Sequence, residues 1–271
     1  MQKYLEVHST PMTQHPTTIK RRHLLLAGLA CAAPAWAQPS ATVVAASDLQ
    51  FALEDIYAQF RAQTGQQLRL VFGSSGNFFA QLQQGAPFHL FLSADERFVF
   101  QLADAGVAQD RGRLYARGRI GLMVPHGSAL RADGELRDLA LALQDGRLKK
   151  LAIANPEHAP YGARAREALQ HAGLWPALQG RLVMGENISQ ATQFALSGST
   201  QGGIVAQSLA LAPSVASRGS FALIPEAWHQ PLLQRMALMK NAPPAAQAFY
   251  AHLSSPAAQA VLERYGFAVP R

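Results

Sequence analysis

The chain has 271 residues, of which 49% are hydrophobic and 15% charged, with a formal net charge of +7. This length is enough to bury one large core or two medium ones, so the chain is neither a small disulfide-stapled domain nor a disordered tail. The 24 Lys and Arg residues are scattered, and no run of them alternates with aromatic residues. The sequence therefore gives no sign of a nucleic-acid partner.

The N-terminal segment indicates export. A basic patch at residues 20–22 (KRR) is followed by an apolar run at residues 24–33 and by the small-residue pattern AWA at residues 35–37. This is the pattern of a secretory signal peptide, and the apolar run is shorter than the roughly 20 residues that a membrane-spanning helix needs. We predict a signal peptide at residues 1–37, cut after Ala37, with Met12 as an alternative start. The mature protein is then expected in the periplasm, reached by general or twin-arginine export.

The single cysteine, Cys31, lies inside this signal segment. Residues 28–31 (GLAC) resemble a lipoprotein acylation site, but Gly28 stands where leucine is usual, so we expect no lipid anchor. With a cut after Ala37 the mature chain keeps no cysteine. Disulfides, thiolate metal sites and cysteine nucleophiles are then excluded.

Apolar strand-like runs alternate with helical patterns along the rest of the chain. The expected strands cover residues 42–46, 68–72, 88–92, 119–124, 151–154, 181–184, 203–206, 221–224 and 232–239. The first expected helix starts near residue 49. The other expected helices cover residues 76–84, 98–105, 139–144, 163–172, 189–196, 245–254 and 257–265. This alternation predicts an α/β protein with parallel-type sheets flanked by helices.

We expect two such sheets, one in each of two lobes. The chain is predicted to cross near Arg119 and to return near Ile224, which places residues 38–119 and 225–271 in the first lobe and residues 120–224 in the second. In open α/β sheets, ligands bind beyond the C-terminal ends of the strands. A ligand cleft between the lobes follows from that rule.

Four strand-to-helix junctions have an unusual composition. They are residues 45–48 (AASD), 73–77 (GSSGN), 155–162 (NPEHAPYG) and 185–189 (GENIS). Each places small, hydroxyl or glycine residues where a helix exposes its first N–H groups, which have no acceptor inside the helix. Together with the helix dipole, these N–H groups form an anion site. Ser47, Ser75 and Tyr161 can add O–H donors, whereas Asp48 is expected to cap its helix and offer its backbone N–H.

The alternative interpretation of each junction is a plain helix cap, which stabilises by about 1 kcal/mol. The occurrence of four such junctions in one α/β chain favours a shared anion site instead. Uncharged donors at fixed positions select a tetrahedral shape and size. Because desolvating a dianion is costly unless its oxygens are hydrogen-bonded, several helix starts must converge on it.

These junctions resemble the periplasmic molybdate-binding proteins of ABC transporters, and the resemblance covers the whole mature chain. The matching segments are residues 45–49 (AASDL), 72–78 (FGSSGNF), 85–88 (GAPF), 91–95 (FLSAD), 154–162 (ANPEHAPYG), 185–190 (GENISQ) and 264–267 (RYGF). The resemblance implies a two-lobed periplasmic binding protein fold of type II that captures molybdate, and also tungstate, for uptake. It further implies a membrane permease as partner, a monomeric protein, and no cofactor, because the metal lies inside the bound anion rather than on protein side chains.

The resemblance also assigns roles to single residues. Ser47 and Ser75 match hydroxyl donors to the oxyanion, and Ile188 matches a backbone N–H donor. Some relatives carry a tyrosine late in the second lobe, where this chain has Ala206. Tyr161 takes the place of that phenol, as in another branch of the family. His89 stands where relatives often carry aspartate and receives no functional role.

Two other hypotheses remain open at this point. The ligand could be another tetrahedral oxyanion, such as sulfate, thiosulfate or phosphate. The chain could also be a secreted serine hydrolase with Ser75 as nucleophile and His158 as base, although residues 73–76 (GSSG) lack the G-x-S-x-G spacing of a nucleophile elbow. A transcription factor's effector domain is disfavoured because the chain has an export signal and no DNA-binding segment.

Overall fold

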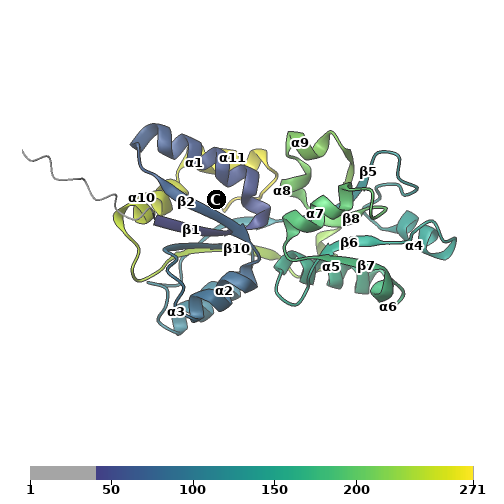
Figure 1. Cartoon of the computed structure of the whole chain (residues 1–271), viewed down its shortest axis with the longest axis horizontal. Coiled ribbons are helices and arrows are strands. Elements are labelled where there is room, and N and C mark those ends of the chain that lie inside the picture. The colour runs from purple at the N-terminus through teal and green to yellow at the C-terminus, as the bar shows by residue number, and fades with distance from the viewer. Residues whose placement is uncertain (1–40, 271) are drawn as a thin grey trace, which may run out of the picture. The chain divides into compact units, whose positions relative to one another are not determined.

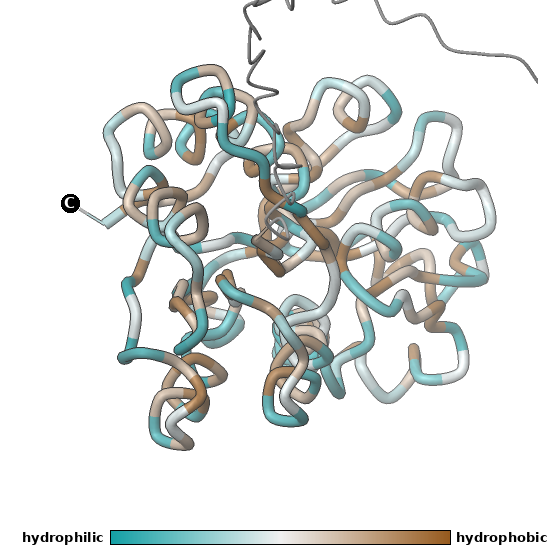
Figure 2. Tube along the Cα trace, turned by 60° about the vertical axis from the view of Figure 1, so that its left-hand side comes forward, coloured by the Kyte–Doolittle hydropathy of each residue, from teal (hydrophilic) through white to brown (hydrophobic). Residues whose placement is uncertain are grey.

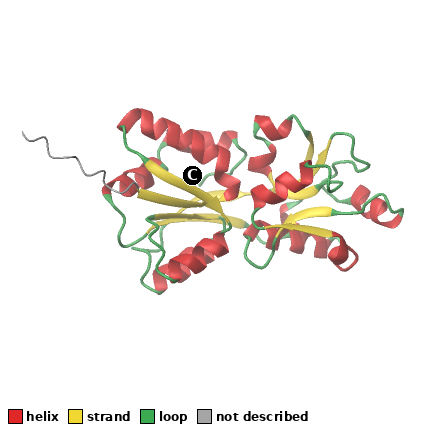
Figure 3. Ribbon diagram, in the orientation of Figure 1, coloured by secondary structure: helices red, strands yellow, loops and turns green. Residues whose placement is uncertain are grey.

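The computed structural model describes residues 41–270, so the predicted signal peptide, the two candidate start residues, Cys31 and the predicted cut after Ala37 lie outside the described residues. The described part contains two five-stranded sheets, each with helices on both of its faces (Figures 1 and 3). None of the helices in residues 41–270 is long and apolar enough to cross a membrane.

The first sheet has the strand order β2-β1-β3-β10-β4. Its strands are β1 (Ala41–Ala46), β2 (Leu68–Gly73), β3 (Leu90–Ser93), β4 (Arg113–Gly118) and β10 (Leu232–Leu238). Strands β1, β2 and β3 are parallel, whereas β10 runs antiparallel to both β3 and β4. One face packs against α1 (Gln50–Thr64), α10 (Pro244–His252) and α11 (Pro256–Arg264), and the other against α2 (Ser75–Gln83) and α3 (Glu96–Asp104).

The second sheet has the strand order β7-β6-β8-β5-β9. Its strands are β5 (Ile120–Pro125), β6 (Leu151–Ala154), β7 (Leu182–Gly185), β8 (Gly203–Ala206) and β9 (Gly219–Leu223). Strand β6 is parallel to β7 and β8, and β5 is antiparallel to β8 and β9. The flanking helices are α4 (Arg137–Gln144), α5 (Pro160–His171) and α6 (Trp175–Leu178) on one side, and α7 (Ile188–Leu196), α8 (Gln207–Ala210) and α9 (Pro213–Ala216) on the other.

The cores explain why the strands read as apolar runs rather than as alternating patterns. In β1, Val43 and Ala45 pack in the cluster that contains α1, α10 and α11, whereas Val44 packs in the cluster that contains α2 and α3. A strand covered on both faces needs apolar side chains at every position. Figure 2 shows these hydrophobic stretches along the interior of the described part.

The two-lobed α/β fold that the sequence predicts is confirmed, with differences of detail. The sheets are mixed rather than purely parallel, because apolar patterns report burial and not the direction of the neighbouring strand. Strand β4 is not predicted, since its sequence RLYARG carries two arginines and has only three buried positions, Tyr115, Ala116 and Gly118. The chain passes from the first sheet to the second between Gly118 and Ile120, and it returns between Leu223 and Leu232.

Candidate oxyanion-binding site

The four unusual junctions meet at one small cavity. Strands β1 and β2 end at Ala46 and Gly73, and strands β6 and β7 end at Ala154 and Gly185. The next element after each is a helix, which begins directly after β1, one or two residues after β2 and β7, and after a five-residue loop in the case of β6. The cavity between these helix starts is lined by Ala46, Ser47, Asp48, Gly73, Ser74, Ser75, Ala94, Ala159, Pro160, Tyr161 and Ile188. Its volume is about 10 Å³. All five residues predicted as ligand-binding line this cavity.

Ser47 is held at the start of a short 3₁₀ helix, η1 (Ser47–Leu49), between β1 and α1. Its hydroxyl donates to Oδ1 of Asn187 at 3.1 Å and accepts from the backbone N–H of Ser189 at 3.2 Å. The Ser189 hydroxyl in turn donates to the Ser47 carbonyl at 2.9 Å. Ser47 therefore joins the end of β1 in the first sheet to the start of α7, which follows β7 of the second.

Ser75 is the first residue of α2 and is fully buried. Its hydroxyl oxygen accepts a hydrogen bond from the N–H of Ala94 at 3.0 Å, which leaves its own proton for another acceptor. Next to it, the Ser74 hydroxyl and the Gly76 N–H both donate to the carbonyl of His158. A Cβ at position 76 would lie 2.5 Å from that carbonyl oxygen, so only glycine allows α2 to approach the loop before α5 this closely.

Ile188 begins α7, and Tyr161 lies in the first turn of α5. The N-cap of α7 is Asn187, whose side chain accepts from the N–H of Gln190 at 3.0 Å. The N–H of Ile188 has no acceptor within its helix, and Ile188 lines the cavity. The start of α7 thus provides both a capped turn and a backbone donor beside the site.

A buried polar network forms one wall of the cavity. The Tyr161 hydroxyl donates to Oδ2 of Asp48 at 2.8 Å, and Nε2 of Gln234 donates to the same oxygen at 2.6 Å. Nε2 of Gln234 also lies 3.0 Å from the Tyr161 oxygen, and the Tyr115 hydroxyl donates to Oε1 of Gln234 at 2.7 Å. The network connects η1, α5, β10 and β4, and all four side chains are buried.

The carboxyl group of Asp48 is the one acid in this network. Burial raises the pKa of Asp48 to about 7, although the hydrogen bonds from Gln234 and Tyr161 act in the opposite direction. Its Oδ1 atom is buried without a hydrogen-bond partner among the described residues. Burial also raises the pKa of Tyr161 well above its ordinary value, and the nearby Asp48 charge adds to this effect.

The expectation that Asp48 only caps a helix is wrong. No side-chain cap bond is found at the start of η1 or of α1. The carboxyl group instead faces Tyr161 and Gln234 across the cavity wall. Gln234 is not among the predicted site residues, although a signal was available: it shares the inward face of a predicted strand with the buried Leu232 and Met236. Tyr115 was missed together with its strand.

The lining of the cavity carries no cationic side chain. Arg164, one turn after Tyr161, is buried but lies 3.5 Å from Asp95 and forms an ion pair with Glu167. Within residues 41–270, no group of three His, Cys, Asp or Glu side chains is arranged to hold a metal ion. The arrangement can therefore bind an anion through uncharged N–H and O–H donors from several helix starts.

Residues 41–268 match the family model of the bacterial extracellular solute-binding proteins. The chain belongs to this family.

Two curated relatives of this solute-binding protein are molybdate-binding proteins. It is 34% identical over 242 residues to molybdate-binding protein ModA of Azotobacter vinelandii, covering 88% of this chain and 92% of the relative. It is 35% identical over 260 residues to ModA of Rhodobacter capsulatus, covering 94% and 99%. The solved structure of the periplasmic molybdate-binding protein of Azotobacter vinelandii superposes with a TM-score of 0.78 at 30% identity, covering 86% of this chain and 100% of that one.

The pair of residues expected for a serine hydrolase does not form in this solute-binding protein. Ser75 bonds the backbone of Ala94, and the serine beside His158 is Ser74, with 3.0 Å between its hydroxyl oxygen and Nδ1. The Ser74 hydroxyl proton is directed to the carbonyl of His158. On the other side of the ring, Nε2 lies 3.5 Å from the largely exposed Glu186. These contacts join α2 to the loops before α5 and α7.

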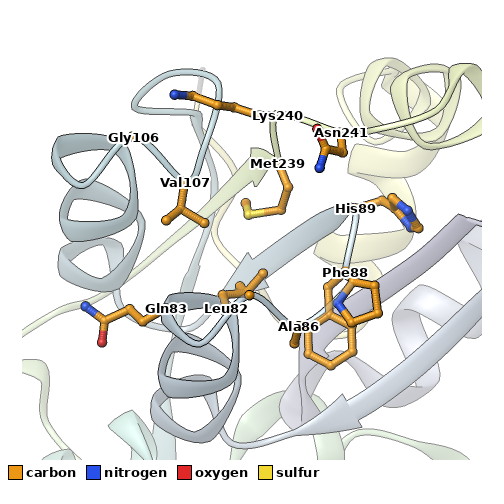
Figure 4. Close-up of a pocket in the computed structure, with 12 residues that line it drawn as sticks. Leu82, Gln83, Ala86, Phe88, His89, Gly106, Val107, Met239, Lys240 and Asn241 are labelled. Atoms are coloured by element: carbon orange, nitrogen blue, oxygen red, sulfur yellow. The ribbon is translucent and has the colours of Figure 1, made fainter.

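A larger cavity of about 460 Å³ lies elsewhere on the first sheet (Figure 4). Its lining includes Gln83 at the end of α2, Gly106 after α3, and Lys240 after β10. His89 also lines this cavity. Its ring Nδ1 accepts a hydrogen bond from the backbone N–H of Thr42 at 3.0 Å, and its backbone N–H donates to the Thr42 carbonyl at 2.9 Å. His89 thus extends the pairing between the starts of β1 and β3, which is a structural role.

Proposed function

We propose that this solute-binding protein captures molybdate, and tungstate with it, for uptake through an ABC transporter. One observation carries the proposal: four helix starts, two following each sheet, converge on one buried cavity whose donors are uncharged. These donors suit a small tetrahedral dianion because N–H and O–H groups approach the cavity from several directions. The molybdate-binding relatives, which match nearly the whole chain, support the choice of ligand.

The proposed donors are the hydroxyl groups of Ser47, Ser75 and Tyr161 and the backbone N–H groups of Asp48 and Ile188. Their common position in the cavity lining supports this set. The hydroxyl of Ser47 now bonds Asn187, and that of Tyr161 bonds Asp48, so both bonds must rearrange when these protons turn to the anion. Rotation about the C–O bond lets each hydroxyl redirect its proton.

The proposed lobes are residues 38–119 with 225–271, and residues 120–224. The membership of the two sheets and the two passages between them support this division. Ligand binding is proposed to hold the lobes together through the same junctions, where Ser47 meets α7 and Ser74 meets the loop before α5. The proposed cellular setting is the periplasm after removal of residues 1–37, with a membrane permease as partner of the monomeric closed form.

Calorimetric titration with a panel of oxyanions tests the proposed function. We expect molybdate and tungstate to bind with closely similar Kd values, because the donors select shape and size and the two anions are nearly equal in size. Sulfate, thiosulfate and phosphate are expected to bind far more weakly. Tight binding of sulfate, or the absence of molybdate binding, would contradict the assignment.

A further inference from the structure

A carboxyl group faces the proposed anion site without a cation to balance it. Asp48 is 1% exposed and lines the cavity together with Ser47, Ser75 and Tyr161. Its Oδ1 has no hydrogen-bond partner in the described part of the chain, and its Oδ2 accepts from Tyr161 and Gln234. An ionisable carboxyl group therefore lies in the wall of a site proposed for a dianion.

An ionised Asp48 conflicts with the bound dianion in two ways. The two negative charges repel each other strongly, because nearly all residues that line the cavity are buried and none of them is Lys, Arg or His. The Tyr161 hydroxyl also has only one proton. While that proton is donated to the Asp48 carboxylate, Tyr161 cannot donate to the anion.

We propose that binding of a tetrahedral dianion to this protein takes up one proton from solvent, which is held on the carboxyl group of Asp48. The inference rests on the proposed function of the same cavity. The proton bonds to Oδ2, the new O–H donates to the Tyr161 oxygen, and the Tyr161 proton turns to the anion. No bond within the anion changes. The charge enclosed in the cavity is then −2 from the ligand alone.

The surroundings of Asp48 support this protonation. Burial places the pKa of Asp48 at about 7 without ligand, so a nearby dianion needs to shift it only slightly to keep the group protonated at neutral pH. The ionisable groups that face it are Tyr161 on α5 and Tyr115 on β4, and burial raises the pKa of both phenols well above the ordinary value. Both remain neutral in the working pH range.

The other elements packed against η1 are α1, α7, α8 and β2. Helices α7 and α8 carry no ionisable side chain. The ionisable residues of α1 and β2 lie exposed or half-buried at the surface; they are Glu54, Asp55, Tyr57, Arg61 and Arg69. Beyond the cavity lining, His158 contacts Ser74 and Glu186, and Arg164 pairs with Asp95 and Glu167. Asp48 is thus the group of the cavity wall that can accept a proton near neutral pH.

Gln234 and Tyr115 act as positioning residues for this carboxyl group. Tyr115 donates to Oε1 of Gln234, which orients the amide so that its Nε2 points at Asp48. The amide thus remains a donor to the carboxyl group in either protonation state. The proton taken up on binding therefore goes to an oxygen whose partners are already in place.

Calorimetry of molybdate binding across pH tests the inference on the exported protein. Molybdate stays a dianion between pH 6 and 8.5, so any pH dependence in that range belongs to the protein. We expect the Kd to be about 30-fold weaker at pH 8.5 than at pH 6, as for one group with a free pKa near 7 that must be protonated in the complex. Titrations at pH 8.5 in buffers of different ionisation enthalpy should show uptake of close to one proton.

Two variants serve as comparison. Asp48→Asn cannot change its charge, so its Kd should stay constant over this pH range and its proton uptake should vanish. Asp104→Asn makes the same chemical change at an exposed ion pair with Arg111 and should keep the pH dependence of the wild type. The proton-uptake measurement needs only the wild-type protein, so a poorly folded variant does not remove the test.

The outcomes separate the inference from the proposed function. A wild-type Kd for molybdate that is constant from pH 6 to 8.5 without proton uptake overturns the inference and leaves the function intact. Retention of the pH dependence in Asp48→Asn also overturns it. If sulfate binds in place of molybdate, the proposed function fails. Proton uptake is then measured on sulfate binding, and its presence or absence decides the inference. If no oxyanion binds at any pH, both proposals fall.

Discussion

The two cavities described above differ in size and in the helix ends that surround them. The larger one, about 460 Å³, lies where α2 and α3 end and is lined by Gln83, Gly106 and Lys240. The smaller one lies where η1 and α2 begin. Helix ends expose carbonyl groups and a partial negative charge, whereas helix starts expose N–H groups and a partial positive charge. The direction of the helices therefore supports the small cavity, rather than the larger one, as the proposed anion site.

The largest expected effect comes from a substitution that crowds the side chains in the wall of the small cavity. A Cβ in Gly118→Ala would overlap the Tyr161 hydroxyl and lie 2.7 Å from Nε2 of Gln234, so the network must move. We expect the variant to lose about 1–3 kcal/mol of unfolding free energy through overpacking and to bind molybdate more than about tenfold more weakly. Chemical denaturation and calorimetry measure the two effects. Gly180→Ala, where nothing lies within 4 Å of an added Cβ, should change neither.

Removing a single donor should have a smaller effect. Tyr161→Phe deletes the hydroxyl that now bonds Asp48 and is proposed to donate to the anion. We expect molybdate binding to weaken by about 1–3 kcal/mol, as for a lost buried hydrogen bond. Tyr250→Phe makes the same change at a half-buried ring beside Arg113 and should bind like the wild type. An unchanged Kd in Tyr161→Phe would show that this phenol is not a ligand.

The stability of the ligand-free protein should depend on pH through Asp48. Its pKa rises from 3.8 to about 7 on folding, so between these pH values the folded state binds more protons than the unfolded state. Stability from this group is therefore present at low pH and is lost as pH rises through about 7. The melting temperature of the wild type relative to Asp48→Asn should rise when pH is lowered from 8 to 5. A constant difference would contradict a carboxyl group that titrates in this range.

The smallest expected effect is at the larger cavity. Lys240→Ala removes the lysine from the lining of that cavity, which is formed by helix ends. We expect the Kd for molybdate to stay within about twofold of the wild type, as for a surface change away from the site. A clear loss of affinity in this variant would place the anion near Lys240 and reverse the comparison between the two cavities.

Several features of this protein follow from the sequence alone. The alternation of apolar runs and helical patterns predicts the α/β fold, because burial on both faces of a sheet demands apolar strands. The composition of the four junctions predicts donors at helix starts, and the structure places Ser47, Ser75 and Tyr161 in one lining. These are local properties, since a helix start depends on a few neighbouring residues.

The role of Asp48 was decided by tertiary structure. Its position at a helix start predicts a capping role for Asp48. Only the fold brings Tyr161 and Gln234 to its carboxyl group. Gln234 reaches the site because β10 lies between β3 and β4 and pairs antiparallel with both, which aligns Gln234 with Ala116 of β4. The order and direction of strands depend on contacts between residues far apart in the chain, which a local pattern does not contain. The burial that moves the pKa of Asp48 arises from those same distant contacts.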